Sequence, residues 1–136
     1  MPSDASGSRF PRLVGIFCLA LGFYDLAACA LIPPDRSTAV VLGFALKGVA
    51  GWIATGVTGL FFLWLGYACL QRKGIAAWVV IAYCVYVIEN IWIYSTGEGR
   101  GLFRSTYAMI IVNALASVML LAFCRVVLDR RSAFDR

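Results

Sequence analysis

The chain alternates between long apolar stretches and short polar connections. Apolar residues dominate four stretches, at 13–32, 38–70, 75–94 and 107–124. The connections between them contain proline, glycine and charged residues, which end helices and favour turns. Because a helix needs about 20 apolar residues to cross a bilayer, the first, third and fourth stretches each predict one membrane-spanning helix.

The second stretch is too long for one simple crossing. A single helix over 38–70 would be roughly 50 Å long, against about 30 Å of hydrocarbon in a bilayer. Two solutions remain open: a strongly tilted helix, or a short interfacial segment at 38–47 followed by a span at 49–70. Gly48 and Gly51 favour a bend at this point, because glycine weakens a helix locally.

The composition places most of the chain in a membrane. Hydrophobic residues make up 62% of the 136 residues and charged residues only 14%, whereas roughly a quarter of the residues of a soluble domain are charged. A chain with so little polar surface is expected to have membrane lipids as its surroundings. The sequence therefore predicts an all-α integral membrane protein, folded as a four-transmembrane-helix bundle.

The same pattern divides the chain into tails and a membrane domain. We expect an N-terminal tail at 1–12, a four-helix transmembrane domain at 13–127 and a basic C-terminal tail at 128–136. The expected spans of the domain are about 13–32, 49–70, 75–94 and 107–124. The first span is expected to be retained, because its apolar run is longer than the core of a signal peptide.

The basic residues beside the spans predict an orientation. One side carries Arg9, Arg12, Arg72, Lys73, Arg125, Arg130, Arg131 and Arg136, and the other carries Arg36, Arg100 and Arg104. By the positive-inside rule both termini are then cytoplasmic, an N-in/C-in arrangement. With no organelle targeting peptide recognised, this distribution fits a bacterial inner membrane.

Several kinds of chemistry are not expected from this sequence. Histidine is absent, and no two of the five cysteines form a Cys-x-x-Cys pair, so we expect no metal site, no cofactor and no catalytic residues. The basic residues lie mostly in connections and tails, which makes nucleic acid a poor partner. An enzyme is therefore the less favoured class, although a membrane enzyme with an acid pair is not excluded.

The informative residues are the polar side chains inside the spans. Candidates for a ligand or ion site are Asp25, Lys47, Tyr86, Glu89, Asn90 and Asn113. Counted from the expected outer ends of their helices, the two carboxyls and Asn113 lie about 8 to 10 Å deep, with Lys47 in the same half. A buried charge in lipid costs about 2.5 to 3.5 kcal/mol on insertion scales, so each needs a partner, a cavity or a proton.

Two interpretations of this polar layer remain open. Asp25, Lys47 and Glu89 form either an interhelical salt-bridge set that fixes helix register or an outward-facing polar site. Small residues accompany them, since Cys18, Gly22 and Cys29 share a stripe with Asp25, and Gly51, Thr55 and Gly59 form a row on the second helix. Such rows allow close helix packing, here within one chain more than between two.

Two functions follow, in order of preference. The first is a non-catalytic accessory or interaction subunit of a membrane complex, because the loops are short and no catalytic constellation is present. The second is a small oligomeric proton- or cation-coupled transporter or channel, because carboxyls inside membrane spans commonly mark ion pathways. Both readings expect a homo-oligomer or a larger complex.

Overall fold

Four long helices form the body of the protein. The computed structural model describes residues 9–103 and 105–134, and within them the helices are α2 (Arg9–Leu31), α3 (Val49–Leu70), α4 (Gly74–Thr96) and α5 (Thr106–Asp129). Each is long and apolar enough to cross a membrane, which supports a multi-pass membrane protein. The expected tails lie partly outside the described residues, at 1–8 and 135–136, as does Arg104.

The connections end the helices in the way their residues predict. After α2, two prolines lead into a short 3₁₀ turn, η1 (Pro34–Arg36). Between α3 and α4 the amide of Lys73 donates to the carbonyl of Ala68 at 3.0 Å. The hydroxyl of Ser105 caps α5 by accepting from the amide of Ala108.

Helical structure extends beyond the expected spans. The helix α5 continues past 124 to Asp129, and its last turn carries an Arg125–Asp129 ion pair of 3.1 Å. The glycine-rich stretch at 95–105, one of the connections between the expected spans, contains the end of α4 and the 3₁₀ helix η2 (Glu98–Leu102). A further 3₁₀ helix, η3 (Arg131–Phe134), follows α5.

The overlong second stretch contains a β-hairpin. Strand β1 (Thr38–Val41) pairs antiparallel with β2 (Phe44–Lys47), and α3 begins immediately afterwards at Val49. The tip residues Leu42 and Gly43 both have positive φ, as a two-residue hairpin turn requires. Of the two alternatives left open for this stretch, the structure has the one with a separate segment before 49. The fold is otherwise helical, as expected, and the two short strands were not predicted.

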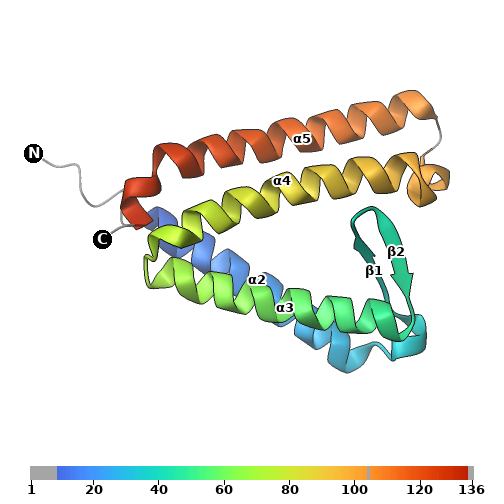
Figure 1. The fold of residues 1–136 in the computed structure, drawn as a ribbon, viewed down its shortest axis with the longest axis horizontal. Helices are drawn as coiled ribbons and strands as arrows, with labels where there is room; N and C mark the ends of the chain where they lie inside the picture. Colours follow the sequence, from blue (N-terminus) through green and yellow to red (C-terminus); the bar gives the residue numbers. More distant parts are fainter. Residues whose placement is uncertain (1–8, 104, 135–136) are drawn as a thin grey trace, which may run out of the picture.

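Helices α2 and α3 form one close pair (Figure 1). Their glycines meet at two levels, where a Cβ added to Gly22 would lie 2.8 Å from the carbonyl oxygen of Gly59 and one added to Gly15 would lie 2.9 Å from that of Gly66. The expected packing of small residues within one chain is therefore present between these two helices.

Helices α4 and α5 form the second pair, and hydrogen bonds join them. The indole of Trp92 donates to the hydroxyl of Ser117 at 3.0 Å. Deeper between the helices, the amide of Asn113 donates to the hydroxyl of Ser95. Polar contacts of this kind fix the rotation of one helix against the other.

The two pairs meet at one end of the molecule and separate at the other (Figure 1). The described chain begins and ends at the closed end, where the rings of Phe10 and Phe134 lie 6.2 Å apart. Most of the fully buried side chains gather there, namely Leu65, Ala68, Cys69, Ala76, Val127 and Phe134. At the separated end the β-hairpin lies between α3 and α4.

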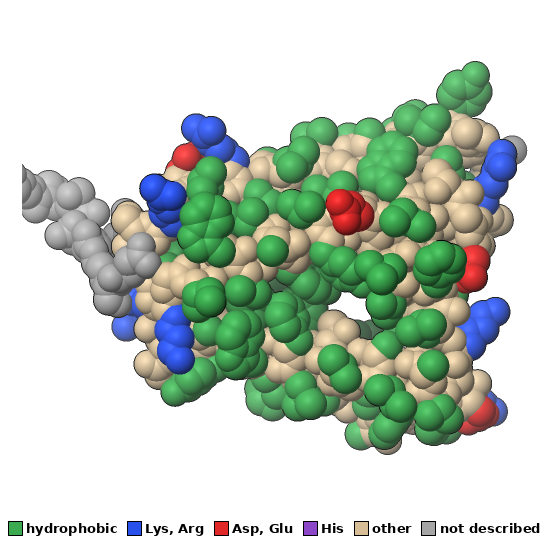
Figure 2. Space-filling view, viewed as in Figure 1, with side chains coloured by type: hydrophobic (Ala, Val, Ile, Leu, Met, Phe, Trp, Pro, Cys, Tyr) green, Lys and Arg blue, Asp and Glu red, His purple; other side chains and the backbone are tan. Residues whose placement is uncertain are grey.

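The surface of the molecule differs between its two ends and its middle. Basic side chains gather at the two ends of the molecule and hydrophobic ones cover the region between them (Figure 2). The same view shows that the molecule is hollowed between the helix pairs, towards the separated end. The hydrophobic band is what a chain surrounded by lipid requires.

Candidate functional site

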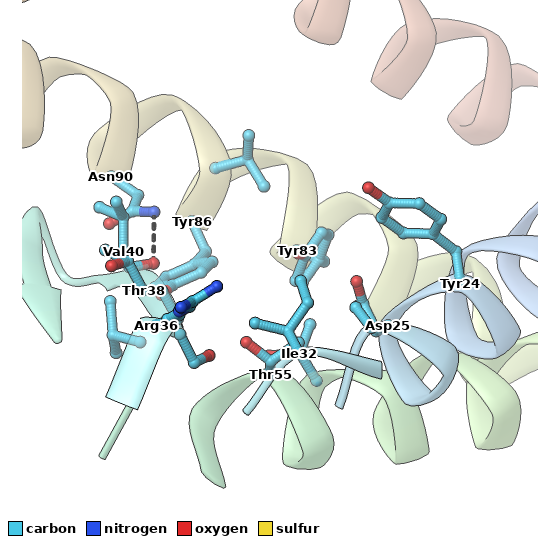
Figure 3. Close-up of a pocket in the computed structure, with 16 residues that line it drawn as sticks. Tyr24, Asp25, Ile32, Arg36, Thr38, Val40, Thr55, Tyr83, Tyr86 and Asn90 are labelled. Atoms are coloured by element: carbon cyan, nitrogen blue, oxygen red, sulfur yellow. Dashed lines mark hydrogen bonds between the residues drawn. The ribbon is translucent and has the colours of Figure 1, made fainter. Parts of the chain in front are cut away.

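A polar cavity of about 500 Å³ lies between the hairpin and the helices. Its walls come from α2, α3, α4 and β1, and the labelled side chains project into it (Figure 3). The hairpin creates the cavity, because it lies where the helix pairs have separated. Three of the six sequence candidates line this space: Asp25, Tyr86 and Asn90.

Asp25 is the acidic side chain of this cavity. Its stripe on α2 includes Gly22, which lets α3 approach so closely that a Cβ added to Gly59 would lie 3.1 Å from the Cβ of Asp25. The carboxylate lies near Tyr24 and Tyr83 (Figure 3). Among the described residues it has no ion pair and no hydrogen bond, although Arg36 lines the same cavity.

Asn90 and Tyr86 hold the hairpin against α4. The Asn90 amide nitrogen donates to the carbonyl of Val40 at 3.1 Å, and its oxygen accepts from the amide of Gly43. The Tyr86 hydroxyl accepts from the amide of Leu42 at 3.4 Å. These side chains therefore shape the cavity wall as well as line it.

Lys47 and Glu89 lie away from Asp25. Lys47 is exposed at the end of β2, where it pairs with Thr38. Glu89 is exposed on the outward stripe of α4, one turn from Val85 and Ile93. Since the structure forms no ion pair among Asp25, Lys47 and Glu89, the expected salt-bridge set is not present among the described residues.

Asn113 belongs to the contact between α4 and α5. Its side chain is completely buried, and its nitrogen donates to Ser95. Its oxygen has no hydrogen-bond partner among the described residues. This position makes Asn113 a packing residue of the second helix pair, at a distance from the polar cavity that it does not line.

A second, apolar cavity adjoins the first. It has a volume of about 910 Å³ and lies between all four long helices. The two cavities have five lining residues in common, namely Tyr24, Asp25, Thr58, Tyr83 and Val87. Asp25 is the one charged residue among those that line the apolar cavity, so it stands at the boundary between a polar and an apolar space.

Several residues of the site had not been selected from the sequence. Arg36 extends from the end of η1 into the polar cavity, together with Thr55 from α3 and Tyr83 from α4 (Figure 3). The ring of Tyr83 lies 5.8 Å from that of Tyr86, one of the residues selected from the sequence. Arg36 follows two prolines and carries no local signal that distinguishes it from a surface residue.

The described residues contain no group of histidine, cysteine, aspartate and glutamate side chains arranged to hold a metal ion. The five cysteines are free thiols. No family model matches the chain, and no curated protein or solved structure is similar enough to match it. The site must therefore be interpreted from its own geometry.

Proposed function

We propose that this protein binds a cation in the polar cavity, as the binding unit of a small cation-coupled transporter or channel. The observation that carries the proposal is the carboxylate of Asp25, which lines the cavity and forms no ion pair among the described residues. A carboxylate in a low-dielectric region requires a cation or a proton to balance its charge. The cavity supplies the space in which such a cation can bind.

The rings beside Asp25 support an organic or alkali cation equally. Tyr24 and Tyr83 lie near the carboxylate (Figure 3), and aromatic faces attract cations through their quadrupole. The hydroxyls of Thr55 and Thr58 also line the cavity, although each already donates to a carbonyl of its own helix. Their oxygens remain available to accept or to coordinate a cation.

The distribution of basic residues indicates on which side of the membrane this cavity lies. The closed end contains the start of α2, the connection between α3 and α4, and the end of α5 (Figure 1). These segments include Arg12, Lys73 and Arg130, so the positive-inside rule supports a cytoplasmic location for that end. The cavity and the hairpin then lie on the opposite side of a bacterial inner membrane. A ligand would enter from outside the cell.

Asp25→Asn tests the proposal in the full chain, purified in lipid nanodiscs. Sodium, potassium and tetramethylammonium ions are titrated, and the thermal unfolding midpoint is measured, because a ligand that binds the folded state raises it. At least one cation should stabilise the wild type, and Asp25→Asn should lose that stabilisation. The effect should also disappear at low pH, where a protonated carboxyl no longer attracts a cation.

Glu89→Gln is the matched control, since it removes a carboxyl from another span and leaves the cavity intact. It should keep the cation-dependent stabilisation of the wild type. The proposal would be contradicted if no cation stabilises the wild type, or if Asp25→Asn responds as the wild type does.

Glu89 itself supports a second candidate function, that of an interaction subunit. Its carboxyl is exposed in the middle of an apolar stripe and has no partner among the described residues. An ionisable side chain that contacts lipid is costly, whereas a neighbouring helix can satisfy it by hydrogen bonding. A second copy of the chain, packed against this stripe, would provide such a helix.

The test of this second candidate is the oligomeric state in nanodiscs or mild detergent. The wild type should be larger than a monomer, and Glu89→Leu should shift the distribution towards the monomer. Glu89→Gln retains hydrogen bonding and should shift it less. A monomeric wild type would rule out self-association through this stripe.

A further inference from the structure

The two adjoining cavities have opposite character. The polar cavity of about 500 Å³ contains both Arg36 and Asp25, whereas the apolar cavity of about 910 Å³ is charged only at Asp25. Both volumes fall within the range of small-molecule sites, about 300 to 1,000 Å³. A hydrated alkali ion would occupy the polar cavity alone and would leave the apolar cavity without a role.

We propose that the ligand of this site is an amphiphile in which an ammonium group is attached directly to an apolar body. The inference rests on the proposed function, because it requires Asp25 to bind a cation, and it adds the chemical class of that cation. The ammonium lies at Asp25, between the rings of Tyr24 and Tyr83, and the apolar body occupies the apolar cavity.

The walls of the apolar cavity fit such a body. They consist of aliphatic, aromatic and sulfur-containing side chains from all four long helices, for example Phe17, Leu21, Phe62, Val80, Met119 and Phe123. Removal of an alkyl chain from water into such surroundings is favourable, and the gain increases with each methylene group. The carboxylate fixes only one end of the ligand, so this site would accept apolar bodies of different shapes.

The order of charges argues against a phospholipid as the occupant. Passing from the apolar cavity to the hairpin, the carboxylate of Asp25 comes first and the guanidinium of Arg36 second (Figure 3). In a phospholipid the phosphate is nearest to the acyl chains, so it would lie beside the carboxylate. An ammonium carried directly on the apolar body has the matching sign, and a polar group at its far end would reach Arg36.

The experiment compares probes in the full chain, reconstituted in phosphatidylcholine nanodiscs. Octyltrimethylammonium is compared with tetramethylammonium, which lacks the apolar body, and with octanol and octyl sulfate, which lack the positive charge. Calorimetric titration should show at least tenfold tighter binding of octyltrimethylammonium than of each other probe. Asp25→Asn should weaken its binding at least tenfold.

A variant of the apolar wall separates specific binding from partition into lipid. Leu21→Trp adds bulk beside the apolar cavity and should remove most of the advantage of octyltrimethylammonium over tetramethylammonium. Leu120→Phe serves the same purpose from α5, if the first variant does not fold. Leu115→Trp adds the same ring at an exposed position that lines neither cavity, and the advantage should be retained.

The outcomes separate the two proposals. Equal binding of both ammonium probes, dependent on Asp25, would overturn the amphiphile but leave cation binding in place. Probe binding that is independent of Asp25 would overturn both. If octyltrimethylammonium still binds more tightly than tetramethylammonium in both wall variants, the octyl chain is partitioning into lipid and the amphiphile proposal is overturned. If phosphatidylethanolamine added to the nanodiscs displaces the probe, the site binds a lipid headgroup instead.

Discussion

Glycines at four positions decide how closely α2 and α3 approach. Gly15 and Gly22 are seven residues apart on α2, and Gly59 and Gly66 are seven apart on α3. Seven residues are close to two helical turns, so each helix presents its glycines on one side. In lipid, where apolar surfaces gain little by leaving the solvent, such close packing is the main source of helix association.

Gly66→Ala should destabilise the protein by about 1 to 2 kcal/mol. A Cβ at this position would lie 2.7 Å from the side chain of Leu19 and 2.8 Å from the carbonyl oxygen of Gly15, and overpacking typically costs about 1 to 3 kcal/mol. The higher helix propensity of alanine offsets part of this, by up to about 1 kcal/mol. Unfolding in mixed micelles, followed by circular dichroism, measures the difference.

Gly56→Ala is the matched control on the same helix. Its added Cβ would meet only the sulfur of Cys29, at an ordinary 3.6 Å. This variant should be neutral, or more stable by up to about 1 kcal/mol, because it gains helix propensity without a clash. If both alanines had the same effect, the close approach of the two helices would be wrong.

At the scale of single residues, the sequence predicts how deep in the membrane a side chain lies better than it predicts which way that side chain points from its helix. Counting along the helices placed Glu89 and Asn90 at the same level, but neighbours on a helix point about 100° apart. Asn90 therefore contacts the hairpin while Glu89 lies on the outward stripe. Which of the two points inwards depends on the neighbouring elements, and the hairpin that decides it was not recognised from the sequence.

Among the elements, the β-hairpin is held from more than one side. Asn90 binds its tip, and the carboxylate of Glu98 in η2 accepts from the amide of Ala45 at 2.9 Å. Gly43 is required at the tip, because its φ is positive and a Cβ there would collide with Ile93. An isolated two-stranded hairpin is at best marginally stable, so these contacts determine whether it remains folded.

Asn90→Leu should release the hairpin from α4. It removes both hydrogen bonds of the amide side chain, and each contributes about 1 kcal/mol. Hydrogen exchange at the amides of 38–47 should therefore become about ten- to a hundredfold faster, as mass spectrometry would measure.

Tyr86→Phe is the milder comparison, because it removes only the 3.4 Å contact to the amide of Leu42. Its hairpin amides should exchange only a few times faster than those of the wild type. Unchanged exchange in Asn90→Leu would mean that the hairpin is held by other contacts.

The hairpin had a weak signal in the sequence. Val40 and Val41 favour a strand, and Gly43 lies at the second of two turn positions, but the first is Leu42 and not the usual asparagine or aspartate. Apolar runs of this length do not distinguish a strand from a helix by periodicity. The long helices were predictable because length and hydropathy suffice for them, whereas this hairpin depends on Asn90 and Glu98, far away in the chain.

The whole molecule consists of two helix pairs joined at one end. The large rings of Phe62 and Tyr83, 4.9 Å apart, connect α3 with α4, and the buried side chains lie mainly towards the end where the chain begins and ends. Neither the angle between the pairs nor the resulting cavities could be predicted from the sequence, because both depend on contacts between distant segments.

The proposed orientation predicts the location of each connection. Reporters fused before Arg9 and after Phe134 should be cytoplasmic, and a cysteine placed at Leu42 should react with a membrane-impermeant thiol reagent added outside the cell. The label would be detected in a variant whose five native cysteines are replaced by alanine. Termini on opposite sides would be incompatible with this fold crossing the membrane four times.

The dependence of the hairpin on later segments has a consequence for biosynthesis. Chains fold progressively from the N-terminus as they are made, and α2 can pair with α3 once residue 70 has been added. The hairpin at 38–47 can contact α3 at that stage, but its hydrogen bonds to Asn90 and Glu98 cannot form until those residues have been added. The first helix pair is thus completed early, whereas the polar cavity lacks a wall until α4 has been made.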